Sequence, residues 1–201
     1  MTLTEKFIRH LELLKEGDRS KLRAAAGAQL GSSLEAFDIF TGIWWPLRNL
    51  SPRAPRREVS WLVAKLFASF AIPHVRSTQA EVGPTLPHLL AKSELLVRGD
   101  RSRYRGRVDA LLQSPLSRLE SPLRWALAVV AAAVQDKHAP GLDWARLLDD
   151  LSIWDRGPAH SRERDIRHAW AEIYFNAVNK DHRGSAYLTV LLSYQFISGG
   201  V

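Results

Sequence analysis

Five arginines lie close together in the segment VRGDRSRYRGR, residues 97–107, around one acidic residue, Asp100. A guanidinium group is planar and permanently charged, and its N–H groups match the oxygens of a phosphate or stack on a base. The segment therefore predicts a contact with the backbone of a nucleic acid, and the alternative is a solvated charged turn. The arginines are Arg98, Arg101, Arg103, Arg105 and Arg107.

The spacing of these arginines predicts how they are placed. An ideal helix cannot hold the last four on one face, but Arg103 and Arg107 are one turn apart and share a face. We expect Arg101 at the start of a helix that runs from about residue 103 to 112. A phosphate backbone lying across that helix N-terminus would also be favoured by the helix dipole.

A second copy of Gly-Asp-Arg-Ser occurs in EGDRSKLR, residues 16–23. Gly17 predicts the left-handed residue that ends a first helix, and Asp18 predicts the N-cap of the next. We interpret the two copies as the same local signal, which ends one segment and caps the next helix, and not as an internal repeat, because their flanking sequences otherwise differ. This hinge leaves three basic residues unexplained: Arg19, Lys21 and Arg23.

Charge is unevenly distributed along the chain, which carries 28 Lys and Arg against 21 Asp and Glu and has a formal net charge of +7. The segment from Arg48 to Lys65 holds five cations and one acid. The segment from Asp136 to Asp155 holds five aspartates and two cations. This asymmetry predicts a basic face suited to a polyanion and a separate acidic face.

The residues that commonly carry catalysis are scattered. The sequence has no cysteine, no HExxH, no GxGxxG, no Walker loop and no GxSxG. His160, Asp165 and His168 are unevenly spaced for a metal site, so we expect no enzyme, no metal and no cofactor. Asp149 and Asp150 flank a leucine stripe and are expected on a solvated helix face, with Arg146 paired to Asp150 at i+4.

Apolar periodicity predicts an all-α protein, a helical bundle. The length of 201 residues fits one domain or two small helical lobes, and the charge distribution adds a basic surface stripe. We expect an N-terminal lobe over residues 1–96, with the Pro-rich loop 71–87 as the candidate boundary, and a C-terminal lobe over 97–180. Residues 181–201 form a tail of uncertain origin. The expected helices span residues 4–15, 18–30, a short stretch from the Ser cap to Gly42, 55–70, 103–112, 121–135, a segment capped by Asp143, and 161–180.

The apolar residues also indicate where the tryptophans lie in the fold and where the protein is located in the cell. Most tryptophans fall on apolar stripes, which favours core positions over base-stacking positions. The longest apolar run, Trp125 to Val134, has about half the length that a bilayer requires. The N-terminal segment is amphipathic and does not resemble a secretory signal. We therefore expect a soluble cytoplasmic protein without a membrane partner.

Three stretches carry a resemblance to a known family: LKEGDRSKLR, GLDWARLLDDLSIWD and RHAWAEIYF. Between them come an aromatic stretch ending in Pro-Leu-Arg, an arginine-rich helix start, and Pro-Leu-Arg-Trp. In this order and spacing, from about residue 4 to residue 180, the chain resembles the CasB family. That family is the small subunit of the type I-E CRISPR surveillance complex, Cascade.

The resemblance implies a two-lobed helical fold without catalytic activity. It implies that two copies stack head to tail beside the backbone and large subunits and the guide RNA. It further implies that the basic surface stabilises the R-loop, largely by holding the displaced DNA strand. The family's basic positions match Arg23, Arg57, Arg107 with Arg105 and Arg103 nearby, and Arg124, with Arg101 added from the cluster above. Weaker candidates are Arg19, Lys21, Arg156 and Arg162.

Two other functions remain open at this point. The chain could be an assembly adaptor whose basic face contacts acidic protein partners without binding nucleic acid. It could also be a helical DNA-binding regulator, although no compact helix-turn-helix spacing is present. A gel shift at low salt separates the first alternative from strand binding, and sequence-specific duplex binding would favour the second.

Overall fold

The computed structural model describes residues 1–76, 83–96, 104–155 and 165–179. Within these ranges the regular structure is helical, apart from one isolated bridge between His74 and Leu142, which confirms the all-α prediction. The helices are α1 (Leu3–Glu12), α2 (Glu16–Ala24), α3 (Leu34–Leu50), α4 (Arg57–Ser69), α5 (Leu86–Leu96), α6 (Arg105–Gln113), the 3-10 turn η1 (Leu116–Arg118), α7 (Glu120–Gln135), α8 (Trp144–Ser152) and a last helix over residues 166–179.

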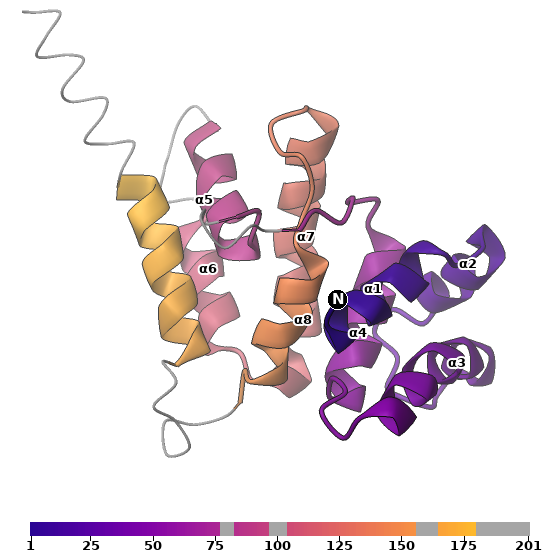
Figure 1. Cartoon of the computed structure of the whole chain (residues 1–201). Helices are drawn as coiled ribbons and strands as arrows, with labels where there is room; N and C mark the ends of the chain where they lie inside the picture. Colours follow the sequence, from indigo (N-terminus) through magenta and orange to yellow (C-terminus); the bar gives the residue numbers. More distant parts are fainter. Residues whose placement is uncertain (77–82, 97–103, 156–164, 180–201) are drawn as a thin grey trace, which may run out of the picture.

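The helices are arranged in two neighbouring groups (Figure 1). Helices α1 to α4 pack together on one side, and α5, α6, α7 and the helix 166–179 lie on the other. Helix α8 lies between the groups and packs against α1 and α4. The expected lobe boundary at residue 97 falls outside the described residues, so the two-lobe division stays a prediction.

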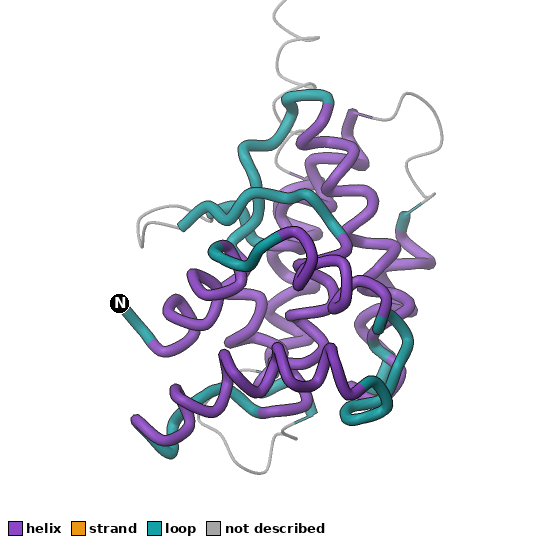
Figure 2. The backbone as a smooth tube through the Cα atoms, turned by 90° about the vertical axis from the view of Figure 1, so that its right-hand side faces the viewer, coloured by secondary structure: helices purple, strands orange, loops and turns teal. Residues whose placement is uncertain are grey.

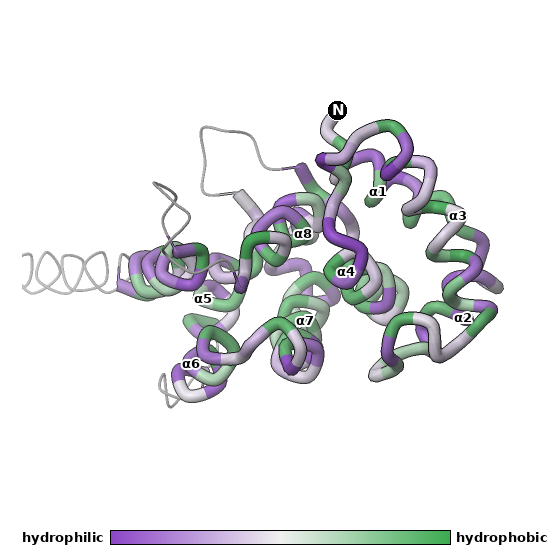
Figure 3. Tube along the Cα trace, turned by 90° about the horizontal axis from the view of Figure 1, so that it is seen from below, coloured by the Kyte–Doolittle hydropathy of each residue, from purple (hydrophilic) through white to green (hydrophobic). Residues whose placement is uncertain are grey.

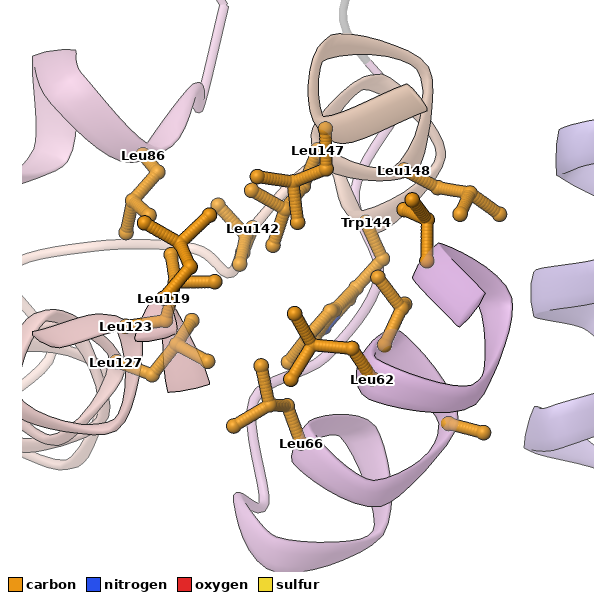
Figure 4. Close-up of a cluster of buried hydrophobic side chains, with 14 of the residues drawn as sticks. Leu62, Leu66, Leu86, Leu119, Leu123, Leu127, Leu142, Trp144, Leu147 and Leu148 are labelled. Atoms are coloured by element: carbon orange, nitrogen blue, oxygen red, sulfur yellow. The ribbon is translucent and has the colours of Figure 1, made fainter. Parts of the chain in front are cut away.

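One connected cluster of buried side chains joins these helices. Along the helices in Figure 3, hydrophobic and hydrophilic residues alternate every few positions, as expected for helices with one apolar side. Among the described residues, we find no helix with the length and hydropathy needed to cross a bilayer. Figure 4 shows where α4, α5, α7 and α8 meet, through Leu62, Leu66, Leu86, Leu119, Leu123, Leu127, Leu142, Trp144, Leu147 and Leu148.

Most tryptophans anchor this core, as predicted. Trp144 is fully buried, and its indole N–H donates to the Ile72 carbonyl oxygen at 3.0 Å. A buried indole needs such an acceptor, because an unpaired N–H in the core is costly. The prediction holds for five tryptophans and not for Trp45, which is 54% exposed, or for Trp125, which is half-buried. The five are Trp44, Trp61, Trp144, Trp154 and Trp170.

The junction of α1 and α2 differs from the expected hinge. Helix α1 begins with a capping box, in which the Thr2 hydroxyl accepts from the Glu5 N–H and the Thr2 N–H donates to the Glu5 carboxylate. Helix α2 has its N-cap at Lys15, so Gly17 and Asp18 lie inside its first turn. The predicted left-handed Gly17 and the predicted Asp18 cap were therefore wrong. Asp18 acts there as a favourable acid near the helix N-terminus.

Helix α3 also differs from its prediction. It does not end near Gly42 but continues through Pro46 to Leu50, and the Ser33 side chain makes no cap hydrogen bond. Apolar residues recur on one side of the whole helix, and their burial continues past the glycine and the proline. Packing thus outweighs the unfavourable helix propensity of these two residues. The buried residues are Ala36, Phe40, Ile43, Trp44 and Leu47.

Helix α8 begins as predicted, because the Asp143 carboxylate accepts from the Arg146 N–H at 2.9 Å. The Arg146–Asp150 pair is also present, at 2.9 Å. The prediction that Asp150 lies on a solvated face was wrong, since Asp150 is only 6% exposed. Its carboxylate accepts from the Trp170 indole N–H at 2.8 Å, so it serves to attach the helix 166–179.

Two further contacts hold the helix 166–179 in place. Trp170 packs edge-to-face on Trp154 with ring centroids 4.9 Å apart. The Tyr174 hydroxyl donates to the buried Glu94 carboxylate of α5. Burial and this carboxylate raise the pKa of Tyr174 above its ordinary value, so the hydroxyl keeps the proton that it donates. These contacts fix the helix against α5 and against the end of α8.

The segment after α4, one of the loops that Figure 2 draws in teal, pairs with the residues before α8. The Leu142 N–H donates to the Pro73 carbonyl oxygen at 2.9 Å, and the Val75 N–H donates to the Leu142 carbonyl oxygen at 3.0 Å. Gly141 lies directly against this pairing with a φ of +148°, a conformation that favours glycine. This pairing ties the end of α4 to the start of α8.

Candidate nucleic-acid interface

Helix α6 places two of the predicted arginines in its first turn, Arg105 and Arg107. No acidic residue lies in that turn, although acids are the side chains that stabilise a helix N-terminus. Both arginines are exposed, and within the described part of the chain neither has an ion-pair partner. An anion bound here would compensate both the guanidinium charges and the helix dipole.

The two arginines point to different neighbours. The Arg107 guanidinium lies over the Trp125 ring of α7, 5.4 Å from its centroid. The Arg105 guanidinium lies over the Phe175 ring of the helix 166–179, at 5.5 Å. Because residues two apart on a helix face different directions, α6 presents one cation on each side. Arg101 and Arg103, the other members of the predicted cluster, lie outside the described residues.

Helix α7 contributes Arg124, which directly precedes Trp125, the residue whose ring lies under Arg107. The Arg124 guanidinium lies over the Phe70 ring, 5.8 Å from the centroid, and its buried Nη1 atom has no hydrogen-bond partner among the residues that the structure describes. Arg23 of α2 reaches the same place, because its Nε donates to the Ala68 carbonyl oxygen at 2.9 Å. The end of α4 thus brings arginines from α2 and α7 together.

These contacts define what we call the arginine path, which consists of Arg23, Arg124, Arg107 and Arg105. It runs from α2 over the end of α4 to α7 and then to both sides of α6. Three of its members are held over aromatic rings, which limits side-chain motion and leaves N–H groups free for a ligand. Each of these four predicted site residues thus contacts a neighbouring element, and Arg23 also pairs with the Glu16 carboxylate at 3.0 Å.

Sequence reasoning missed the aromatic partners on this path: Phe70, Trp125 and Phe175. A signal existed for Trp125, which follows Arg124 directly and could have been assigned to the surface rather than the core. Phe70 and Phe175 lie far in sequence from Arg124 and Arg105, whose guanidinium groups lie over their rings, so only the folded chain reveals these contacts. Arg118 was missed as well, and it lines a surface hollow of about 550 Å³ together with Gly27 and Arg124.

Lys65 does not belong to the basic surface, although it was counted with the basic segment from Arg48. Its side chain is 3% exposed and its ammonium group lies 2.7 Å from a Glu120 carboxylate oxygen. It also donates to the Ala28 carbonyl oxygen, while the other Glu120 oxygen accepts from the Gly27 N–H. This buried pair joins α4, α7 and the turn after α2, and is structural.

Arg57 lies at the opposite end of α4 from Arg23. Eleven residues of helix separate it from Ala68, a rise of about 17 Å. Its Nε lies 3.6 Å from the Glu58 carboxylate, and it borders an open hollow of about 960 Å³. The structure thus places Arg57 in a second basic group, away from the arginine path. The other arginines that line this hollow are Arg48, Arg53 and Arg56.

The weaker candidates are placed as follows. Arg19 donates to the Glu12 carbonyl oxygen, and Lys21 lies 3.4 Å from the exposed Glu35 carboxylate. Both therefore already contact α1 or α3. Arg156 and Arg162 lie outside the described residues, as does His160 of the unevenly spaced histidine group. Within the described ranges, no group of acidic residues and histidines has an arrangement that could hold a metal ion.

Asp149 borders the Arg57 hollow, and its carboxylate accepts from the Thr4 hydroxyl at 3.4 Å. Burial of the carboxylate raises its pKa to about 6, with smaller contributions from Asp150 and Asp143 that Arg146 opposes. The folded chain therefore binds the proton of the Asp149 carboxyl more tightly than the unfolded chain. The stabilisation of the fold by this proton is present below pH 4 and is lost as the pH rises through 6.

We expect Asp149→Asn to remove this loss. At pH 7.5 the variant should unfold with a free energy up to about 1 kcal/mol higher than the unmodified chain, a small value because the residue is partly solvent-exposed. At pH 4 the difference should vanish. Urea unfolding at the two pH values measures it. An equal difference at both pH values would contradict the assignment.

Comparisons with known proteins identify the family of the chain. The model of the family named CRISPR-associated protein Cse2 matches residues 18–175. The chain belongs to the Cse2 family. This confirms the resemblance to CasB proteins, because solved members of the Cse2 family also carry that name. The match includes the described members of the arginine path and Arg57.

A curated Cse2-family relative is the CRISPR-associated protein Cse2 of Thermus thermophilus. It is 33% identical over 125 residues, which are 62% of this chain and 60% of the relative. The chain thus spans about three fifths of the length of the curated relative that it matches. The aligned part is long enough to support family membership together with the family model.

Solved Cse2-family structures share the fold. The crystal structure of CasB from M. ruber has a TM-score of 0.70 at 22% identity and covers 92% of this chain and 99% of that one. CasB from Thermus thermophilus has a TM-score of 0.60 at 28% identity, with 88% and 99% covered. A chain of a CRISPR RNA-guided surveillance complex has a TM-score of 0.64 at 16% identity, with 92% and 99% covered, and shows similarity of fold alone.

Proposed function

We propose that this Cse2-family chain is a non-enzymatic small subunit of a type I-E CRISPR surveillance complex. It stabilises the R-loop by sequence-independent contacts to the displaced DNA strand, and it contacts the guide RNA or its neighbouring subunits in the assembly. Its partners in that complex are the backbone and large subunits and a second copy of itself. The observation that carries the proposal is the arginine path, in which four arginines from three helices each contact a ring or a carbonyl oxygen of a neighbouring element.

The proposed chemistry is electrostatic. The guide RNA selects the target sequence by base pairing, so the small subunit does not itself need to recognise bases. It needs cations at intervals along a surface that a strand can follow. Guanidinium groups held over rings lose little conformational freedom on binding phosphate, because their rotamers are already restricted. The arginine path supplies such groups at both sides of α6 and at the end of α4.

A salt titration of single-stranded DNA binding tests this proposal. Four phosphate contacts, each contributing about −0.7, predict a slope near −3 for the logarithm of the affinity against the logarithm of salt concentration. Strands of unrelated sequence should bind with equal affinity. The measurement is fluorescence anisotropy with labelled strands, on the isolated chain and on the assembled complex.

The assembly-adaptor alternative has its own supporting observation, the second basic group at the Arg57 hollow. Four arginines and Asp149 line this hollow, which suits an acidic protein segment at least as well as a strand. If the chain enters the complex normally but binds no strand even at low salt, the adaptor function is favoured. A salt slope near zero with measurable binding would also contradict the proposed phosphate contacts.

A further inference from the structure

An apolar groove lies beside the arginine path, between the end of α5, the start of α6 and one side of α7. Its volume is about 470 Å³. The α7 residues that form it follow the i, i+3, i+4, i+7 spacing of a single helix face. Two of them are exposed alanines, so the floor of the groove is low and its walls are larger side chains. The residues are Leu96, Tyr104, Trp125, Ala128, Val129 and Ala132.

The two aromatic walls are held in a fixed relation. The rings of Tyr104 and Trp125 lie edge-to-face, with centroids 5.7 Å apart and planes at 81°. Tyr104 and Arg107 are three residues apart, and both contact the same indole. One tryptophan therefore belongs to the arginine path through Arg107 and to the groove through its own exposed surface.

The groove also differs in charge between its two ends. Arg107 lies over Trp125, in the N-terminal half of α7, whereas Asp136 and His138 line the groove where α7 ends. A phosphate is attracted to the first end and repelled by the Asp136 carboxylate at the second. A ligand that is anionic at one end and flat, apolar and hydrogen-bonding at the other matches this pattern. A nucleotide of a single strand has this combination of properties.

We propose that the groove binds an unpaired nucleobase of the strand whose phosphate lies at Arg107. The base stacks against Trp125 and Tyr104 over the alanine floor, and its polar edge faces Asp136 and His138. The inference rests on the proposed strand binding and adds to it a base-dependent contact that selects for unpaired over paired strands. A base in a duplex cannot enter, because both of its faces are already stacked within the helix.

The occupant is a nucleobase and not an apolar protein segment because of Arg107. The guanidinium lies over the indole that lines the groove, and it has no carboxylate partner within the described residues. An apolar peptide would leave this cation desolvated and unpaired, which is unfavourable. A nucleotide pairs it with the phosphate that is attached to the inserted base.

Ala132→Leu tests the proposal by filling the groove. Leucine is a good helix former and Ala132 is exposed, so the fold should be retained. Ala110→Leu, at an exposed position of α6 that does not line the groove, is the matched control. The probes are a single strand that contains 2-aminopurine and a strand of the same length in which every base is replaced by an abasic site.

With the unmodified chain and Ala110→Leu, we expect the 2-aminopurine emission to change on binding and the abasic strand to bind about five- to tenfold more weakly. With Ala132→Leu, the emission change should be lost and the two strands should bind equally, with the salt dependence unaltered. If Ala132→Leu keeps the emission change, or if the unmodified chain binds both strands equally, the groove does not take a base although strand binding stands. If no strand binds to any of the three chains, strand binding itself fails, and the inference fails with it.

Discussion

Reversing the charges of Arg105 and Arg107 together, as Arg105→Glu/Arg107→Glu, is expected to weaken single-stranded DNA binding about tenfold to 100-fold at low salt. Both guanidinium groups are exposed in the first turn of α6, and each would otherwise contact a phosphate. The salt slope should become shallower by about 1.4, since two contacts of about 0.7 each are lost. Anisotropy titrations at several salt concentrations measure both effects.

The fold should tolerate this double substitution. Glutamate in the first turn of a helix is favoured by the helix dipole, so α6 should gain rather than lose stability. The matched control is Arg9→Glu/Lys15→Glu, which changes the net charge equally at exposed positions of α1 and of the N-cap of α2. If the control weakens binding as much as the α6 variant, the effect reflects net charge, and the assignment of the site to α6 is wrong.

Gly141→Ala is expected to lower the free energy of unfolding by about 3–4 kcal/mol. A Cβ atom at this position would lie 2.4 Å from the Pro73 carbonyl oxygen and 2.7 Å from the Val75 Cγ2 atom. That oxygen cannot move away freely, because it accepts the Leu142 N–H. The φ of +148° adds strain for any residue with a side chain. Thermal and urea unfolding measure the loss.

Gly17→Ala serves as the control for this prediction. Gly17 lies in the first turn of α2, and nothing lies within 4 Å of the position of its added Cβ. The substitution should therefore raise stability by about 0.5–1 kcal/mol, the ordinary gain of alanine over glycine in a helix. A loss of less than 1 kcal/mol for Gly141→Ala would show that the pairing between the α4 end and the α8 start adapts easily.

The sequence predicted the fold best where one signal dominated. Helix α8 follows from the Asp143 cap and the leucine stripe, and α4 and α7 follow from apolar periodicity. Helix α2 ends at Ala24 and not at the expected residue 30. Two other errors at helix boundaries involve a glycine. Helix α2 begins before Gly17 and α3 continues past Gly42, because the buried residues that follow, such as Leu22 and Trp44, hold the chain in a helix. Burial of such side chains outweighs about 1 kcal/mol of glycine propensity.

The candidate site was predictable in residue type but not in arrangement. Arginine content and spacing indicated α6, and the resemblance added Arg23 and Arg124. The sequence could not reveal that Lys65 is removed from the surface, because its partner Glu120 lies 55 residues away. Nor could it reveal which rings Arg105 and Arg107 contact, because that depends on which helices flank α6. Both facts are products of tertiary packing.

The helix 166–179 affects the positions of the arginines on α6, although it contributes none of the charges of the arginine path. Phe175 carries Arg105, while Tyr174 and Trp170 fasten the same helix to Glu94 and Asp150. The interval between the two cations of α6 is therefore set by how this helix is seated. A substitution at Tyr174 or Glu94 would alter that interval without changing a single positive charge. In the proposed binding mode, residues that carry no positive charge thus tune the length of strand between the two cations. Variation among relatives at these positions would change that length while the arginines stay the same.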